Sequence, residues 1–142
     1  MRYSLAAASI VLALATVGSS VADADPATPF DGVWNVVIAC ADASDGAASY
    51  TLRFSAQVRS GAMLGQFSSV QTSAMATVSG QIQPNGQAFL RVDGKTGDIV
   101  YTVGRVRPGT PYHYTVNARF AGNAGSGTRN ELRSCNLNFT KA

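Results

Sequence analysis

The fold can be inferred from the stretch Phe30-Asp31-Gly32-Val33-Trp34-Asn35-Val36-Val37-Ile38-Ala39-Cys40. Successive side chains of a β-strand point to opposite sides, so one face of this stretch would carry Trp34, Val36, Ile38 and Cys40. The other cysteine, Cys135, lies in the last strand-like run of the chain. A disulfide between Cys40 and Cys135 would make the first and last strands neighbours. A meander whose end strands pair is a closed barrel, so we predict an all-β barrel with this disulfide.

The two cysteines also fix a register for the end strands. Setting Cys40 opposite Cys135 in an antiparallel pair aligns the apolar residues of one strand with those of the other: Ile38 with Leu137, Val36 with Phe139, and Trp34 with Lys141 at the barrel's end. A slip by one residue would turn one set of side chains outward. The agreement between disulfide and packing therefore favours closure.

Further runs of alternating apolar and polar residues predict the remaining strands at 50–59, 63–69, 74–82, 88–92, 99–103, 112–120 and 131–139. Gly- and Pro-rich segments between them, such as 104–111 and 121–130, are expected to be loops. No helical period follows the leader, which favours an eight-stranded antiparallel up-and-down β-barrel. In this meander the loop 104–111 would lie at the end that holds the termini, and the loop 121–130 at the opposite end.

The inward positions carry many aromatic rings: Trp34, Tyr50, Phe54, Phe67, Tyr101, Tyr112, Tyr114, Phe120 and Phe139. An eight-stranded barrel is only just wide enough to be filled by side chains or to hold one small ligand. With so many rings available, we expect a mostly filled interior.

The N-terminus has the features of a secretory signal peptide. Arg2 precedes an apolar run from Leu5 to Val17, and Ala22-Asp23-Ala24 supplies a small-x-small cleavage pattern, with Ser20-Val21-Ala22 as an alternative. We therefore predict a signal peptide at 1–24 and a single barrel domain at 25–142, in the periplasm or secreted, without a membrane span. The formal net charge of +3 is mild and does not indicate nucleic acid as a partner.

Short motifs resemble known families. Gly32-Val33-Trp34 is similar to the Gly-x-Trp opening of the calycin barrels, which include lipocalins and avidins, and the segment 60–67 resembles their turn and third strand. The segments 101–105 and 132–135 also resemble small exported alphaproteobacterial proteins of unknown role. In lipocalins a basic residue packs over the motif tryptophan, and the resemblance implies Lys141 for this role, with Arg105 and Arg107 as alternatives. Trp34 is the only tryptophan, so biotin binding is not implied.

The residues that could carry chemistry do not form a recognisable catalytic set. His113 has outward parity, no metal-ligand spacing accompanies it, and no serine has the surroundings of a nucleophile elbow. We therefore predict a protein that is not an enzyme and needs no metal or other cofactor. A small cationic rim for an anionic partner could be formed by Arg119, Arg129 and Arg133.

Three functions are compatible with this pattern. The first is an exported, non-enzymatic binding or interaction module that uses its loop end. The second is a carrier that holds a small apolar molecule in the barrel. The third, a periplasmic inhibitor of a cell-wall hydrolase, follows only from analogy with other small disulfide-bonded barrels.

Overall fold

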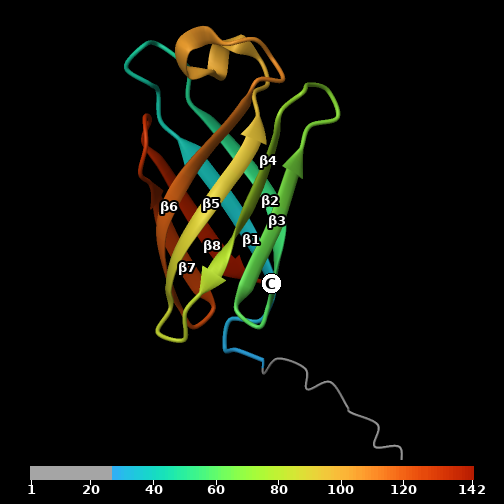
Figure 1. Cartoon of the computed structure of the whole chain (residues 1–142), viewed down its shortest axis with the longest axis vertical. Helices are drawn as coiled ribbons and strands as arrows, with labels where there is room; N and C mark the ends of the chain where they lie inside the picture. The colour runs from blue at the N-terminus through green and yellow to red at the C-terminus, as the bar shows by residue number, and fades with distance from the viewer. Residues whose placement is uncertain (1–26) are drawn as a thin grey trace, which may run out of the picture.

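The structure, a computed structural model, describes residues 27–142, so the predicted signal peptide and its cleavage site lie outside the described part. Eight antiparallel strands form a closed barrel (Figure 1). Their bounds are β1 Gly32–Cys40, β2 Tyr50–Arg59, β3 Ala62–Ser68, β4 Met75–Ile82, β5 Gln87–Lys95, β6 Pro111–Ala121, β7 Ala124–Arg129 and β8 Cys135–Lys141. Within this part of the chain no helix is long and apolar enough to cross a membrane.

Closure occurs where the sequence predicts it. β1 pairs with β8 from Trp34↔Lys141 to Cys40↔Cys135, in the predicted register. Cys40 and Cys135 form a disulfide across this pair, 95 residues apart in the sequence. Because β1 also pairs with β2 over its whole length, the sheet has no free edge. The predicted fold class and the disulfide are confirmed.

The barrel has two different ends (Figure 1). The terminal end holds residues 27–31, the C-terminus and the short turns at 60–61, 83–86 and 122–123. The loop end holds the longer connections 41–49, 69–74, 96–110 and 130–134. We use these two names below.

The predicted strand at 99–103 is wrong. This segment instead forms two short 3-10 helices, η1 Ile99–Tyr101 and η2 Val103–Arg105. The Asp98 side chain accepts a hydrogen bond from the Val100 N–H and so caps η1, and Gly104 has a φ of 75° that an extended strand does not use. A run of five mostly apolar residues fits either conformation, and here the local capping determines the outcome.

The predicted loop at 121–130 contains a strand, β7. Its inward positions are Gly125 and Gly127, opposite Phe120 and Ala118 of β6. A Cβ atom at Gly125 would lie 2.5 Å from the Phe120 ring, so the large side chain of the neighbouring strand occupies the space that an inward residue of β7 would need. The strand therefore lacks the apolar alternation by which strands are recognised.

The sequence predicts one strand that is absent, at 99–103, and misses one that is present, β7, so the total stays at eight. Between these two errors the chain runs in the direction opposite to the prediction. The segment 104–111 consequently lies at the loop end, not with the termini as predicted. The turn between β6 and β7 lies at the terminal end, whereas the sequence predicts the loop 121–130 at the end opposite the termini.

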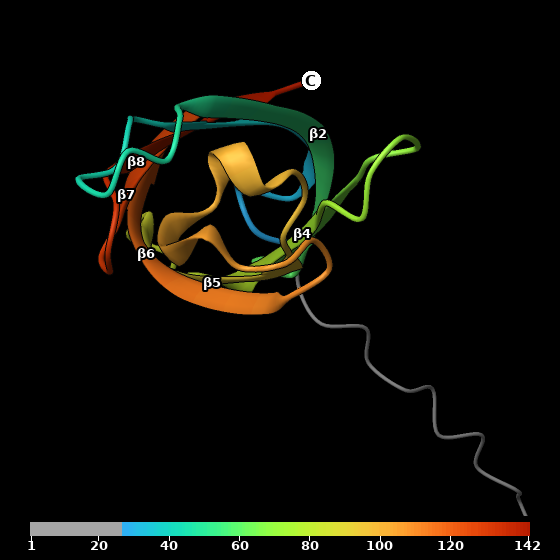
Figure 2. The ribbon, with the colours of Figure 1, turned by 90° about the horizontal axis from the view of Figure 1, so that it is seen from above.

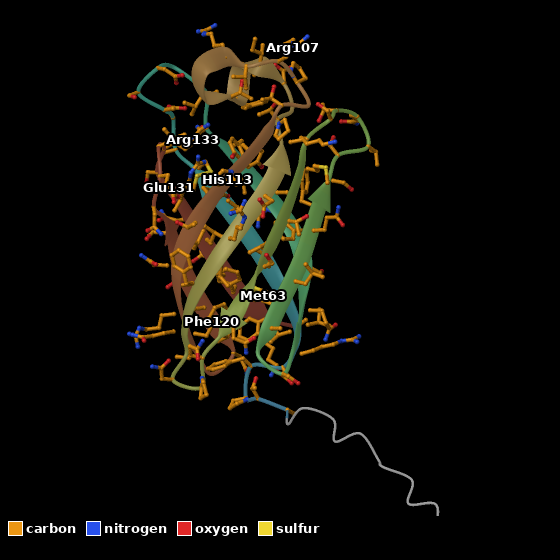
Figure 3. The ribbon with its side chains drawn as sticks, viewed as in Figure 1. Met63, Arg107, His113, Phe120, Glu131 and Arg133 are labelled. Atoms are coloured by element: carbon orange, nitrogen blue, oxygen red, sulfur yellow. A yellow bond between two sulfur atoms is a disulfide. The ribbon has the colours of Figure 1, made fainter. Side chains whose placement is uncertain are left out.

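The terminal half of the barrel is filled. Phe120 is the centre of an aromatic cluster, with ring centroids 5.3 Å from Trp34, 4.8 Å from Phe139 and 6.0 Å from Phe30. Trp34 is fully buried, and its indole N–H donates to the Phe30 carbonyl at 2.8 Å, so this buried donor is paired. Figure 3 shows Phe120 and Met63 toward this end.

Asp31 ties the leading segment to the turn between β2 and β3. Its carboxylate accepts hydrogen bonds from the Ser60 and Gly61 N–H groups at 2.8 and 2.9 Å and from the Thr28 hydroxyl at 2.6 Å. The hydrogen bond from Thr28, followed by that from Gly61, lowers the pKa of Asp31 to about 2. Hydrogen bonds therefore hold this carboxylate in its charged form.

Candidate functional site

The loop half of the barrel encloses a cavity of about 570 Å³. Inward side chains from several strands form its wall: Tyr50 and Leu52 of β2, Phe67 of β3 and Tyr112 of β6. Met75 of β4 also borders the cavity, but Ala76 takes the inward position on that strand. The expectation of a mostly filled interior is therefore wrong for this half. The aromatic cluster around Phe120 closes the barrel at the terminal end only, so the barrel is a cup that opens at the loop end.

A roof covers the mouth of the cup. Figure 2 shows the segment between β5 and β6, which includes η1 and η2, lying across the barrel opening. Thr102, Val103 and Val106 of this segment line the cavity. The Thr96 hydroxyl donates to the Arg107 carbonyl at 2.8 Å, so the segment folds back on itself.

Few hydrogen bonds join the roof to the loop 41–49. The Gly104 N–H donates to the Asp45 carboxylate at 2.6 Å, and the Ala48 N–H donates to the Val100 carbonyl at 2.9 Å. The hydrogen bond from Gly104 is the largest of the causes that lower the pKa of Asp45. Two direct hydrogen bonds therefore tie the roof to this side of the barrel.

Three tyrosines stand on the inner face of the loop half. The rings of Tyr112 and Tyr114 are stacked, with centroids 6.1 Å apart and planes 5° apart. The Tyr112 hydroxyl donates to the Met75 carbonyl at 3.3 Å, whereas no partner within residues 27–142 hydrogen-bonds the hydroxyl of Tyr50 or Tyr114. Burial raises the pKa of Tyr50, Tyr112 and Tyr114, so these phenols stay neutral and can donate.

Arg129 is an inward residue of β7. It pairs with Val116 of β6, whose side chain is fully buried, and it follows the inward glycines 125 and 127 at the same parity. Its guanidinium carbon lies 4.0 Å from the centroid of the Tyr114 ring, a cation–π contact, and the side chain lines the cavity. Arg129 Nε donates to the Glu131 carbonyl at 2.7 Å. Half-buried against a ring, this cation faces the cavity.

Arg133 is a buried cation that holds three loops together. It is only 6% exposed, and its guanidinium donates to the backbone carbonyls of Ala41, Ala48 and Tyr101, with Tyr101 and Ala48 each at 2.9 Å. The guanidinium also lies over the Tyr50 ring, 5.0 Å from its centroid. Because its donors are engaged by carbonyls, Arg133 positions the loops and the roof around the mouth. Figure 3 shows Arg133 toward the loop end.

The predicted cationic rim is brought together only in part. Arg129 and Arg133 both line the cavity, together with Lys95 and Asp98. Arg119 instead points outward from β6, where it pairs with Gln87 of β5 and with Ser126 of β7 near the terminal end.

The other predicted residues lie outside the cavity. Lys141 pairs with Trp34 at the terminal end, and its Nζ donates to the Pro29 carbonyl at 3.1 Å, while its side chain packs against Gly32. His113 is exposed on the outer face of β6, beside Asp93. Within residues 27–142, no three side chains of the His, Cys, Asp or Glu type converge in a way that could hold a metal ion.

Sequence reasoning missed most of the cavity wall. It placed Tyr50, Phe67 and Tyr112 on the inner face correctly but treated them as core residues. It also treated Arg129 as a rim residue, because β7 was taken for a loop. A parity count through Gly125 and Gly127 would have placed Arg129 inside the barrel.

Comparisons with known proteins give no assignment for this site. No protein-family model matches the chain, and no curated protein and no solved structure matches it. The function must therefore be argued from the cavity and the residues that line it.

Proposed function

We propose that this protein is a small-molecule binding protein that holds its ligand in the loop-end cavity. One observation carries the proposal: a cavity of about 570 Å³ is built on strands whose other half is solidly packed. Ligand pockets in proteins typically measure about 300 to 1,000 Å³ and combine apolar walls with a few polar groups. The cavity fits both criteria, since Leu52, Phe67 and Val106 line it beside tyrosines and arginines.

The wall offers the chemistry of recognition. Ring faces and methyl groups can contact an apolar body, while neutral phenols and a guanidinium can donate hydrogen bonds. Rigid strands present these groups, which keeps the entropic cost of binding low. A carrier that binds and releases its ligand needs a movable cover, and the roof is tied to the loop 41–49 by few hydrogen bonds.

The test is a fluorescence titration of the purified, oxidised protein with two dyes that share one ring system. The neutral dye is N-phenyl-1-naphthylamine, and the anionic dye is 8-anilinonaphthalene-1-sulfonate. Leu52→Trp should block binding, because Leu52 lines the cavity and indole is larger than isobutyl. Leu64→Trp is the matched control, since Leu64 is 61% exposed on the outer face of β3.

We expect saturable binding of at least one dye, lost in Leu52→Trp and kept in Leu64→Trp. If neither dye binds saturably, or if Leu52→Trp binds as well as the unaltered protein, the proposal is wrong.

An interaction surface at the loop end is a second candidate. Val70 in the loop 69–74 is 99% exposed and Leu132 in the loop 130–134 is 85% exposed, and large apolar side chains at loop tips are features of protein contacts. A protein captured from the periplasm by the unaltered chain but not by a Val70→Ser/Leu132→Ser variant would support this function. The same experiment would detect a cell-wall hydrolase as the partner. If the unaltered chain and the Val70→Ser/Leu132→Ser variant capture the same proteins, the interaction surface at the loop end is contradicted.

A further inference from the structure

The cavity contains a cation whose donors are not all used. Arg129 Nε is bonded to the Glu131 carbonyl at 2.7 Å, and Nη1 has only the weak acceptor Cys135 Sγ at 3.9 Å. Nη2 has no hydrogen-bond partner within residues 27–142. The cavity-lining cation can therefore donate further hydrogen bonds.

Among the described residues, no carboxylate forms a salt bridge with Arg129. The salt bridge that the structure contains within residues 27–142 joins Arg91 to Asp93 on the outer face. The Glu131 carboxylate accepts hydrogen bonds from the Thr115 N–H at 2.8 Å and from the Thr115 hydroxyl at 2.6 Å, and these bonds, followed by the charge of Arg129, lower its pKa. A half-buried guanidinium that is near a carboxylate but not bonded to it can still bind an anion from outside the chain.

Positive charges predominate around the cavity. Lys95, Arg129 and Arg133 line it, against the single carboxylate of Asp98, which accepts from the Val100 N–H at 3.0 Å. Arg129 is also close enough to Tyr50, Tyr112 and Tyr114 for its charge to act on all three phenols. Two of these hydroxyls, those of Tyr50 and Tyr114, have no protein partner in the described part of the chain.

We infer that the ligand is an anionic amphiphile: a small molecule with one acidic group, which binds Arg129, and an apolar or aromatic body, which packs against Leu52 and Phe67. The acidic group could be a carboxylate, a sulfonate or a phosphate, because guanidinium and hydroxyl donors recognise all three. The Tyr50 hydroxyl is the second donor available to it. This inference rests on the proposed function and names the class of ligand.

Arg133 has a different role at the same site. Its Nε, Nη1 and Nη2 atoms all donate to carbonyls of the loop 41–49 and of the roof, so it shapes the mouth and adds positive potential without serving as the direct contact. Arg129 is therefore the residue whose removal should separate anionic from neutral ligands.

The test uses the same two dyes, which differ only by a sulfonate, with Arg129→Gln. The matched control is Arg119→Gln, which removes one positive charge from the outer face of β6. In Arg129→Gln we expect the affinity for 8-anilinonaphthalene-1-sulfonate to fall by roughly tenfold or more, as for loss of a charge-assisted hydrogen bond. The affinity for N-phenyl-1-naphthylamine should change by less than about twofold, and Arg119→Gln should bind both dyes like the unaltered protein.

Arg129→Lys provides a second variant that keeps the charge and should retain part of the preference for the sulfonate. Trp34 fluorescence of each variant checks that the barrel is folded, because Trp34 is fully buried in the terminal half.

The outcomes distinguish the two proposals. If Arg129→Gln weakens both dyes equally, or leaves the sulfonate dye unaffected, the inference is overturned while small-molecule binding stands. If neither dye binds the unaltered protein, the proposed function itself fails.

Discussion

Reducing the Cys40–Cys135 disulfide should lower the free energy of unfolding by about 4 to 5 kcal/mol. The bond joins residues 95 apart in the sequence, and the chain-entropy model for a loop of that size gives about 4.7 kcal/mol at 25 °C. The folded barrel should survive, because seven residue pairs from Trp34↔Lys141 to Cys40↔Cys135 still align β1 with β8. A single domain is typically stable by about 5 to 15 kcal/mol, so the reduced barrel would be marginal.

The assay is urea unfolding with and without reductant, followed by the fluorescence of Trp34, the single tryptophan of the chain. With a slope of about 2 kcal/mol per molar urea, the midpoint should fall by about 2 M. A Cys40→Ala/Cys135→Ala variant should behave like the reduced protein, apart from the lost packing of two sulfur atoms. A midpoint shift below about 0.5 M would refute the reasoning, because the bond would then not restrain the unfolded chain.

Three further predictions concern packing, acid stability and the roof. Gly125→Ala should lower the free energy of unfolding, measured with urea, by about 1 to 3 kcal/mol, because the added Cβ would lie 2.5 Å from the Phe120 ring. An unchanged free energy of unfolding would mean that this ring has room to move. Asp31 has a pKa of about 2 against an ordinary 3.8, so its contribution is complete above pH 3.8 and is lost as the pH falls toward 2. In Asp31→Asn the free energy of unfolding should therefore depend less on pH between 3.8 and 2 than in the unaltered protein. The same pH dependence in both proteins would contradict this prediction. Arg133→Gln releases carbonyls of the loop 41–49 and of the roof. Exchange of the Ala48 amide hydrogen, which bonds to the Val100 carbonyl of the roof, should therefore accelerate severalfold; unchanged exchange would mean that Arg133 does not hold the roof.

The fold could be predicted from the sequence where inward side chains are large. β1 and β8 carry apolar residues at their inward positions beside the cysteines, except for Lys141 at the terminal end, and only one register aligns them. β7 could not be recognised in this way, because the side chains of β6 fill the space above Gly125 and Gly127. The segment 99–103 is too short for its periodicity to separate an extended from a helical backbone, and the cap at Asp98 determines it.

The cavity was harder to predict than the fold. Parity correctly places Tyr50 and Tyr112 inside, but it does not say whether rings from opposite strands meet or leave space between them. That depends on how the strands tilt and on the roof, which is made by a segment that the sequence pattern predicts as a strand and a loop. The arginines show the same limit, since Arg129 faces inward only because β7 is a strand.

The location of the bound ligand tests the central claim most directly, and the leucines allow it to be measured. Leu52 lines the loop-end cavity, whereas Leu90 is fully buried in the core and does not line it. In protein labelled with ¹³C at the leucine methyl groups, addition of 8-anilinonaphthalene-1-sulfonate should shift the Leu52 signals and give nuclear Overhauser contacts between these methyls and the dye, with Leu90 unchanged. A saturated dye complex in which Leu52 does not respond would place the ligand elsewhere and contradict the account.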